Sequence, residues 1–381
     1  MKSILILLHC ESNTGYAIAP LEATFYQMSL NLCDQDRARI HFGYPSMQRG
    51  PTTTLPAEFN QYLIADSHSA SPEDAQRVET YLRRHDIDTI FGFDQGVNRP
   101  LYKAFRRGGV RHFISYWGAP MSSINNPLRR SLKRLEVALS RHGPDHYIFE
   151  SRGMQETAVL GRGIPAARTS VVYLGVDSTR FRPDPADARQ VFERLSVPAG
   201  RRIFFYAGHM EPRKGVAVIM QAANRLAERR AQDDWHVLLF GNKGDEHLPH
   251  SALLTDKARG HVQFGGYRPD LDVLQRGCYA AMIASTGWDS FPRSGMEMQA
   301  SGLPLLVSDL RGLRESIEDS VSGLLFPTGD SAALANAMER LLDDPALRDR
   351  LGAQARARIE KHFTAEVQLE RLTAVVGRVA A

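Results

Sequence analysis

Cysteine is scarce in this sequence, with three residues in a chain of 381. Cys10, Cys33 and Cys278 are too few and too widely spaced for a disulfide framework or a structural zinc site, which favours a reduced, cytoplasmic protein. Long apolar runs are also missing, since none approaches the ~18 residues that span a bilayer. The opening run 4–8 stops at His9, so it predicts a buried first strand rather than a signal peptide.

Glycine is sparse where two common classes of enzyme need it. The turn after the first strand, residues 9–16, contains one glycine, Gly15. A dinucleotide-binding oxidoreductase needs Gly-x-Gly-x-x-Gly at this point, because the pyrophosphate must approach bare backbone. No Gly-x4-Gly-Lys-Ser/Thr phosphate loop occurs either. The sequence therefore disfavours nicotinamide-dependent enzymes and nucleotide hydrolases of the P-loop kind.

Credible metal ligands are missing as well. Asp86-Ile87-Asp88 has the Asp-x-Asp spacing by which some enzymes bind Mg²⁺ or Mn²⁺, but in those enzymes the motif follows a strand. Here it precedes the predicted strand 89–93. We interpret the two aspartates as residues of a turn between a helix and a strand. No metal and no cofactor are therefore expected.

Short apolar runs alternate with helical segments along the whole chain, and they predict parallel strands that are buried on both faces. A chain of 381 residues also exceeds the ~250–300 at which a single core stops growing. The predicted fold is therefore α/β, with two doubly wound, Rossmann-like domains. The Pro-rich stretch 181–185 is interpreted as the hinge linker. The predicted strands are 4–8, 89–93, 112–116, 147–149 and 170–173, followed by 203–207, 236–240, 262–264, 281–284 and 305–307.

Positive charge is concentrated in the first half of the chain. The first 180 residues carry 21 Lys and Arg against 17 Asp and Glu, whereas the remainder carries 26 of each. Between Arg99 and Arg141 ten cations face one acid, Glu136. Such a patch suits an anionic partner, and an anionic membrane surface suits it better than nucleic acid, for which no recognition motif is present. A solvated basic face without a partner is the alternative.

Residues 127–141 within this patch form an amphipathic helix on a helical wheel. One stripe holds Leu128, Leu132, Leu135 and Leu139. The opposite arc holds Val137 and five cations, which are Arg129, Arg130, Lys133, Arg134 and Arg141. The leucines are expected to pack on the first sheet and the cations to face outward.

The strongest local motif follows the predicted strand 203–207. It reads Gly208-His209-Met210-Glu211-Pro212-Arg213-Lys214-Gly215 and leads into an amphipathic helix. A glycine turn at a helix N-terminus with two cations inside it is suited to an anion such as a diphosphate. The alternative is an ordinary turn with Arg213 and Lys214 in solvent.

Two carboxylates follow the predicted strand 281–284. Asp289 is placed in a turn and Glu297 in the helix that begins near Ser294, so both can face one cleft. Carboxylates accept hydrogen bonds from sugar hydroxyls, as a bound ribose and hexose would require.

From about residue 171 to about residue 372 the sequence resembles family 4 glycosyltransferases of the GT-B class, which are retaining enzymes that use nucleotide sugars. The shared motifs are Leu174-Gly175-Val176-Asp177, the 208–215 turn, Phe264-Gly265, the 289–297 block and Leu303-Pro304. The resemblance implies two domains that face each other across a cleft. They are an acceptor-side domain (1–180) and a nucleotide-sugar-binding domain (181–364), followed by a C-terminal helix (365–381) that crosses back to the first domain.

The resemblance also implies roles for individual residues. Catalytic contributions fall to Lys214 at the donor diphosphate, Asp289 at the donor sugar and Glu297 at the nucleotide ribose. The rest of the implied donor site consists of Gly208, His209, Arg213, Phe291 and Ser294. The implied chemistry is a metal-independent, front-side substitution at the anomeric carbon that transfers a hexosyl group.

Three departures from the family pattern affect these expectations. His209 stands where an arginine is usual, and Asp289 stands where a glutamate is usual. The place where many members carry a histidine after a first-domain strand reads Ser115-Tyr116-Trp117-Gly118-Ala119-Pro120, so no catalytic histidine is assigned. The acceptor side is expected at the ends of first-domain strands, on Glu11, Thr14, Gly15, Tyr16, Asp94 and Trp117.

The function expected from the resemblance and the basic patch is transfer of a sugar to a cell-envelope glycan or glycolipid. The protein would act peripherally on the cytoplasmic face of the inner membrane. Two alternatives stay open. One is a GT-B-like nucleotide-sugar epimerase, which needs no acceptor, and the other is a non-catalytic GT-B protein that binds the donor.

Overall fold

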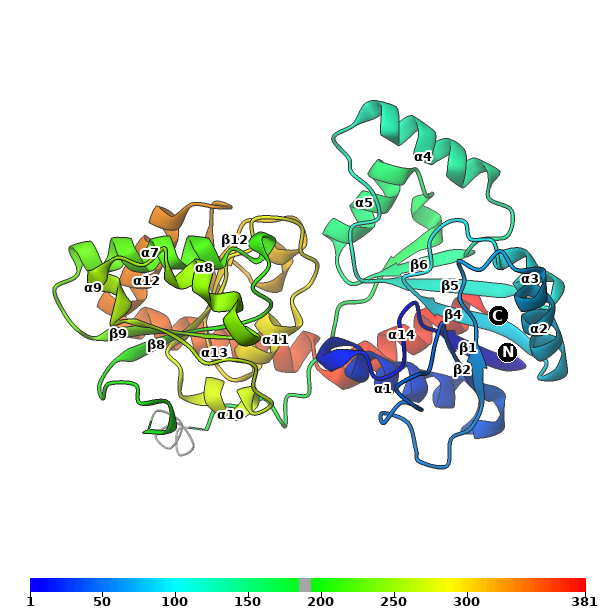
Figure 1. Ribbon diagram of the computed structural model, residues 1–381, viewed down its shortest axis with the longest axis horizontal. Coiled ribbons are helices and arrows are strands. Elements are labelled where there is room, and N and C mark those ends of the chain that lie inside the picture. The colour runs from blue at the N-terminus through cyan, green and yellow to red at the C-terminus, as the bar shows by residue number, and fades with distance from the viewer. Residues whose placement is uncertain (185–192) are drawn as a thin grey trace. The chain divides into compact units, whose positions relative to one another are not determined.

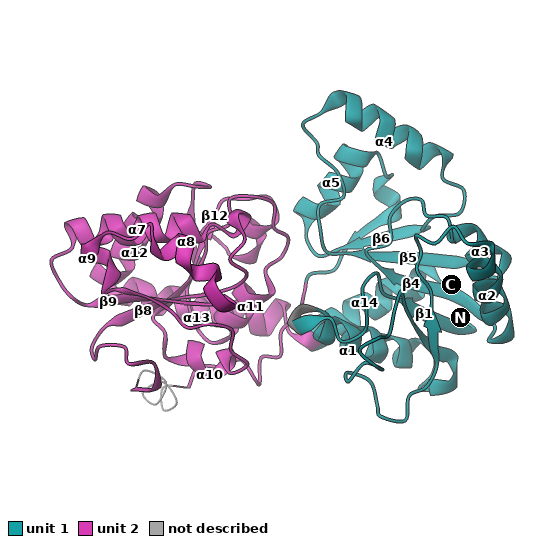
Figure 2. Cartoon of the chain, viewed as in Figure 1, with its two compact units in different colours: residues 1–173, 366–381 teal, residues 174–365 magenta. Residues whose placement is uncertain are grey.

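The computed structural model describes residues 1–184 and 193–381, without the side chains of residues 16 and 17. The chain divides into two compact units (Figure 2). Unit 1 comprises Met1–Tyr173 with Glu366–Ala381, and unit 2 comprises Leu174–Ala365. The expected boundary after residue 180 therefore falls inside unit 2. Of the expected hinge linker 181–185, Pro185 lies outside the described residues.

Unit 1 is built on a seven-stranded sheet in which every pairing is parallel. The strand order is β3-β2-β1-β4-β5-β6-β7 (Figure 1). Its strands are β1 Ser3–Leu7, β2 Ile40–Tyr44, β3 Tyr62–Ile64, β4 Ile87–Phe93, β5 His112–Trp117, β6 His146–Phe149 and β7 Thr169–Val171. Its helices are α1 Gly15–Leu32, α2 Pro72–Arg84, α3 Tyr102–Arg107, α4 Pro127–Leu139, α5 Arg152–Arg162 and α14 Ala365–Val379.

Unit 2 is built on a six-stranded parallel sheet with the order β10-β9-β8-β11-β12-β13. Its strands are β8 Arg202–Ala207, β9 Trp235–Phe240, β10 Val262–Phe264, β11 Ala280–Ile283, β12 Leu305–Ser308 and β13 Gly323–Phe326. Its helices are α7 Val216–Arg229, α8 Leu248–Ser251, α9 Asp256–Arg259, α10 Leu271–Leu274, α11 Arg293–Ala300, α12 Ser331–Asp343 and α13 Pro345–His362.

In unit 2, apolar residues follow one another along most strands and do not alternate with polar residues. Phe204 and Leu239 belong to an apolar cluster with residues of α7 and α12, whereas their neighbours Phe205 and Leu238 belong to a second cluster. Successive side chains of a strand point to opposite faces of the sheet, so both faces are covered. The prediction of two doubly wound α/β domains with parallel sheets is confirmed.

Three strands of the structure were not predicted. β2 and β3 lack a long apolar run, because β2 contains His41 and Gly43 and β3 spans three residues. β13 begins with Gly323 and also lacks a clear strand signal. Each of these strands pairs with a neighbouring strand of its sheet, and this backbone pairing compensates for weak propensity.

The C-terminal helix α14 contributes to unit 1 after the chain leaves α13 in unit 2. Its Leu372 and Val376 are fully buried, and Gln368 Nε2 lies 3.4 Å from the Tyr116 hydroxyl of β5. In Figure 1, α14 lies beside α1 in the same unit.

Asp86 and Asp88 lie at the amino end of β4. Asp86 has φ +50°, the left-handed conformation of a turn, and Asp88 accepts hydrogen bonds from Arg111 Nη2 at 2.8 Å and from the Lys2 backbone at 3.1 Å. Asp88 therefore holds the Lys2 backbone and the Arg111 side chain at the amino end of β4. Over residues 1–184 and 193–381, no cluster of three His, Cys, Asp or Glu residues is placed to hold a metal, and no helix is long and apolar enough to cross a bilayer.

Helix α4 is amphipathic as predicted, but the prediction that its leucines pack on the sheet is wrong. The leucine stripe faces solvent, and the opposite side of the helix packs on α5 and on the core through Val137. Arg130 Nε donates to the Leu160 carbonyl at 3.2 Å, and Glu136 pairs with Lys133 and Arg162 at 2.8 Å each. Arg130 thus satisfies a carbonyl in the last turn of α5, where cations are favoured, and this contact lies on the inward side of α4.

Candidate functional site

Both sheets have a topological switch point, where the chain changes the side of the sheet on which it adds strands. In unit 1 this point lies between β1 and β4, and in unit 2 it lies between β8 and β11. In open parallel sheets ligands bind outside the carboxyl ends of the strands at this point. The loops after β1, β4, β8 and β11 are therefore the candidate ligand-binding loops.

The loop after β8 packs backbone against backbone on the loop after β11. Gly215, with φ +72°, precedes α7, and a Cβ at this position would collide with the carbonyl oxygen of Ala284. The Arg213 carbonyl accepts from the backbone N–H groups of Thr286 at 2.7 Å and Gly287 at 3.2 Å. Only glycine permits this approach at position 215, and the approach aligns the N-terminus of α7 with the loop after β11.

Lys214 and Asp289 meet across the switch point. Lys214 Nζ lies 2.6 Å from Asp289 Oδ2, and the two side chains are 19% and 12% exposed. Asp289 Oδ2 also accepts from Ser285 Oγ at 2.9 Å, and its Oδ1 accepts from the backbone N–H of Ser290 at 3.1 Å. The carboxylate is thus held in one orientation by three donors. Its neighbour Tyr206 remains a neutral phenol, because burial and the charge of Asp289 raise its pKa.

Arg213 has a different environment from Lys214. Its Nε pairs with Glu211 Oε2 at 2.7 Å, its Nη1 donates to the Trp288 carbonyl at 3.1 Å, and its guanidinium lies 4.1 Å from the centre of the Trp288 ring. These contacts brace the 286–288 loop against η3 Pro212–Lys214. In the structure the Arg213 side chain therefore supports the 286–288 loop. The sequence motif alone predicts that it is a second cation, beside Lys214, for a bound anion.

The other expected donor residues lie on the same loops or on α11. Glu297 is buried in the second turn of α11 and Ser294 lies one turn before it, so both are on one side of this helix. Phe291 is buried, and its ring centre lies 5.3 Å from that of Phe363. His209 is exposed, and its carbonyl accepts from the Tyr206 hydroxyl at 2.7 Å. At Gly208, a Cβ would lie 2.8 Å from that same hydroxyl.

In unit 1, His9 follows β1 and Asp94 follows β4. His9 Nδ1 lies 3.8 Å from Asp94 Oδ2, and the His9 ring lies 5.0 Å from the ring of Phe93. Asp94 has φ +52° and its Oδ1 accepts from the Gly118 N–H at 3.0 Å. Burial raises the pKa of the Asp94 carboxyl, while His9 and the Gly118 N–H oppose the rise.

The sequence prediction found Asp94 but missed His9 as a possible site residue. The available signal was a histidine directly after the first strand, at the carboxyl edge of the sheet. Cys10, beside it, is no nucleophile: burial and the charges of Glu22 and Asp94 raise its pKa to about 11, so the thiol stays protonated.

The remaining acceptor-side residues have structural contacts or lie apart. Glu11 Oε1 accepts from the Arg49 N–H at 3.1 Å, and Thr14 Oγ1 donates to the Glu11 carbonyl at 2.5 Å, so both tie the 9–15 loop to itself and to a neighbouring loop. Gly15 is exposed with φ +73°. Trp117 ends β5, and its indole Nε1 is buried without a partner among the described residues. Tyr16 falls in the first turn of α1, and its side chain lies outside the described part of the chain.

Buried Glu22 of α1 is a second residue that the sequence prediction missed. Its carboxylate accepts hydrogen bonds from Tyr44 at 2.9 Å, Thr52 at 2.7 Å and Thr54 at 3.0 Å. These donors come from β2 and the loop after it. Glu22 therefore anchors the loop that in turn braces Glu11.

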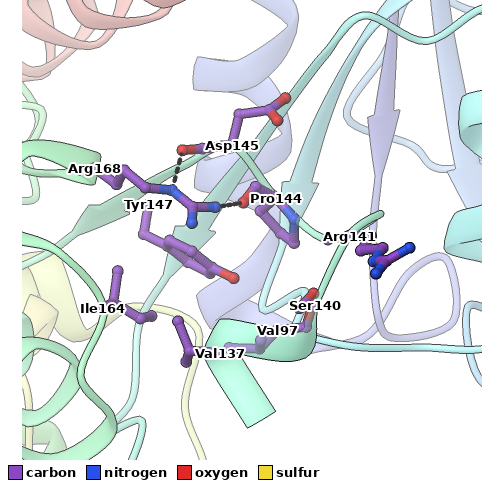
Figure 3. A pocket seen from close by; sticks show the side chains of 10 residues that line it. Val97, Val137, Ser140, Arg141, Pro144, Asp145, Tyr147, Ile164 and Arg168 are labelled. Carbon is purple, nitrogen blue, oxygen red and sulfur yellow. Dashed lines mark hydrogen bonds between the residues drawn. The ribbon is translucent and has the colours of Figure 1, made fainter. Parts of the chain in front are cut away.

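A cavity of about 270 Å³ lies in unit 1 beneath the last turn of α4 (Figure 3). Its lining includes Val137, Arg141, Tyr147 and Arg168, and Arg168 donates to the carbonyls of Pro144 and Asp145 at 2.5 and 2.9 Å. None of the expected site residues lines it.

Comparisons with known proteins agree with this architecture. Residues 187–358 match the family described as Glycosyl transferases group 1. The chain is 27% identical over 307 residues to the putative glycosyltransferase EpsD of Bacillus subtilis, covering 75% of this chain and 77% of EpsD. It is 34% identical over 164 residues to a phosphatidyl-myo-inositol mannosyltransferase of Mycobacterium leprae, which is 41% of this chain and 42% of that protein.

Among solved structures, HepE of Anabaena in complex with UDP superimposes with a TM-score of 0.77 at 19% identity, over 99% of this chain and all of HepE. The fold is therefore that of the GT-B glycosyltransferases, and the chain is a glycosyltransferase. The match to the glycosyl transferases group 1 lies within its second unit.

Proposed function

We propose that the chain transfers a hexosyl group from a nucleoside-diphosphate sugar to a glycan or glycolipid acceptor of the cell envelope, with retention of configuration and without a metal. The observation that supports this proposal best is the Lys214–Asp289 pair at the switch point of unit 2. It joins an ammonium group, suited to a diphosphate, with a carboxylate suited to sugar hydroxyls.

The relatives support the class of donor and of acceptor. HepE has been crystallised with UDP and with UDP-glucose, and the Mycobacterium leprae relative is a mannosyltransferase of a phosphatidylinositol. By analogy, the donor of this chain is a nucleotide sugar and its acceptor is lipid-linked or part of an envelope glycan. The nucleotide base and the sugar stay open.

Donor binding would use three parts of unit 2. Lys214 and the backbone N–H groups at the start of α11 would neutralise the diphosphate, and Glu297 would accept hydrogen bonds from the ribose. A diphosphate beside Lys214 competes with Asp289 for the ammonium group. Once that pair is loosened, Asp289 is available to the hydroxyls of the donor sugar.

The chemical step would be a front-side substitution. The acceptor hydroxyl oxygen forms a bond to the anomeric carbon on the face from which the diphosphate leaves. The bond from that carbon to the diphosphate oxygen breaks, and the hydroxyl proton passes to the departing diphosphate. Negative charge grows on the diphosphate during this step, so Lys214 stabilises the transition state more than the bound donor.

Acceptor binding is assigned to unit 1. His9 and Asp94 lie at its switch point, where an imidazole and a carboxylate can hold a sugar hydroxyl by hydrogen bonds. Location at the cytoplasmic face of an anionic membrane is part of the same proposal, since the acceptor is envelope material and ten cations lie between Arg99 and Arg141.

The test is a panel of UDP-, GDP- and ADP-sugars. A donor that binds the native chain should raise its melting temperature, by mass action. Transfer should then require an added acceptor. A sugar that changes configuration with donor alone would indicate the epimerase instead, and binding without transfer to any envelope acceptor would indicate the non-catalytic protein. If no nucleotide sugar raises the melting temperature, the donor assignment is wrong.

A further inference from the structure

Four leucines lie together on the solvent-facing side of α4. Leu128, Leu132, Leu135 and Leu139 are 73%, 61%, 56% and 69% exposed. Their spacing of four, three and four residues places them on one stripe of the helix. A single exposed leucine is ordinary on a protein surface, but a contiguous apolar stripe indicates a surface that another body covers.

The rest of unit 1 holds this stripe outward. Val137, on the opposite side of α4, packs with the core cluster that contains Tyr147 and Ile164. Glu136 links Lys133 to Arg162 of α5, and these two cations hold the pKa of Glu136 low although burial opposes them. Rotating the leucines inward would break these contacts and expose Val137. The outward orientation is therefore a stable property of the unit.

The length and charge of α4 suit a membrane surface. The helix has 13 residues and is therefore about 20 Å long, too short to cross a bilayer but sufficient to lie in its interface. Arg129 lies about 100° around the helix from Leu128, so it borders the leucine stripe, whereas the sequence prediction placed it on the opposite arc. Arg129 is exposed, as are Arg134 and Arg141. Cations beside an apolar stripe complement anionic headgroups that lie above acyl chains.

We propose that α4 is an interfacial membrane helix whose leucine stripe inserts among the acyl chains of an anionic bilayer. The other candidate occupant is a second copy of the chain. Two α4 helices packed in parallel through their leucines would bring the two Arg129 side chains close together, which disfavours that pairing. The inference goes beyond the proposed sugar transfer, because it assigns the membrane contact to particular side chains and does not depend on the donor site.

Insertion differs from attraction by charge alone in its dependence on the leucines. The variant Leu132→Asn/Leu135→Asn keeps every cation and should fold normally, because both side chains are exposed. In sedimentation with vesicles of phosphatidylcholine and phosphatidylglycerol, its binding should fall at least about tenfold. The matched control is Leu248→Asn/Leu253→Asn in unit 2, where the leucines are 53% and 43% exposed, and it should bind as the native chain does.

A second measurement reports the depth of the helix. Tryptophan introduced by Leu132→Trp should shift its emission to shorter wavelength on vesicles and should be quenched by brominated acyl chains. Salt should weaken binding of both native chain and leucine variant, but the difference between them should persist. Equal loss in the leucine variant and its control, or unquenched emission, would overturn the proposal. So would a dimer that dissociates in the leucine variant while vesicles bind neither protein.

Discussion

The two units place a cation-capable side chain opposite a carboxylate at the same topological position, but they differ in chemistry. In unit 2 the pair is Lys214 and Asp289, in contact at 2.6 Å, and in unit 1 it is His9 and Asp94, at 3.8 Å. A lysine ammonium is a compact donor-only group, whereas an imidazole ring carries nitrogens that can donate or accept a hydrogen bond. The difference suits the proposed donor diphosphate in unit 2 and the proposed acceptor hydroxyl in unit 1.

The turns that carry these pairs differ as well. Gly215 directly precedes α7 and Gly15 is the first residue of α1, and the two have nearly the same φ, +72° and +73°. Gly215 lies against the backbone of the next loop, but nothing lies within 4 Å of a Cβ placed on Gly15. A tight backbone turn surrounds the proposed diphosphate site, and an open turn adjoins the proposed acceptor site.

The largest expected effect concerns these two glycines. Gly215→Ala adds a collision with the Ala284 carbonyl to the cost of a left-handed residue, so it should lower the free energy of unfolding by about 3 kcal/mol or more. Gly15→Ala should cost only the conformational strain, about 1–2 kcal/mol. Urea denaturation of both variants measures the difference. Equal losses would show that the two turns are equally tight.

The next effect concerns Lys214. Lys214→Ala should weaken donor binding or turnover by about 10- to 150-fold, because a charge-assisted contact of roughly 1.5–3 kcal/mol is lost. Calorimetry should be done well below the melting temperature, since the variant leaves Asp289 without its cation. Lys257→Ala is the control: this exposed lysine of the same unit pairs with Glu228. If both variants bind the donor like the native chain, Lys214 does not hold the diphosphate.

Glu297→Gln tests the ribose contact. The amide keeps the shape of the side chain but loses its charge, so binding of the nucleotide sugar and of the free nucleoside diphosphate should both weaken, by roughly tenfold. Calorimetry with each ligand gives the two values. Unchanged affinity for the free nucleotide would remove Glu297 from the ribose.

His9→Asn should raise the KM for acceptor several-fold and leave donor affinity unchanged, since His9 belongs to the other unit.

Asp94→Asn should act in the same way without lowering stability at pH 7. Burial raises the pKa of the Asp94 carboxyl, so its ionisation destabilises the native state above that pKa. Asp94→Asn removes this cost and should therefore raise the free energy of unfolding at pH 7. The increase should disappear below pH 3.8, the ordinary pKa of the carboxyl, where the group is protonated in both the native and the unfolded state. A loss of donor affinity in either variant would contradict the separation of roles.

The smallest expected effect is that of a chelator. Turnover should be unchanged in excess EDTA, because the proposal gives the charge of the diphosphate to Lys214 and backbone N–H groups. An activity that falls in EDTA and returns with Mg²⁺ or Mn²⁺ would show that unit 2 neutralises the diphosphate in another way.

Sequence alone determined the two parallel sheets and the loops of the proposed donor site. Short apolar runs bounded by turn residues indicate strands that are covered on both faces, and Gly215 and Lys214 are recognisable because their chemistry is local. Tertiary structure decided which side of α4 faces inward, because a helical wheel separates two faces but does not show what each one meets. It also turned Arg213 onto Trp288 and brought His9 to Asp94, since β1 and β4 are adjacent in space but far apart in sequence. Partners of this kind come from strand order, which no local pattern encodes.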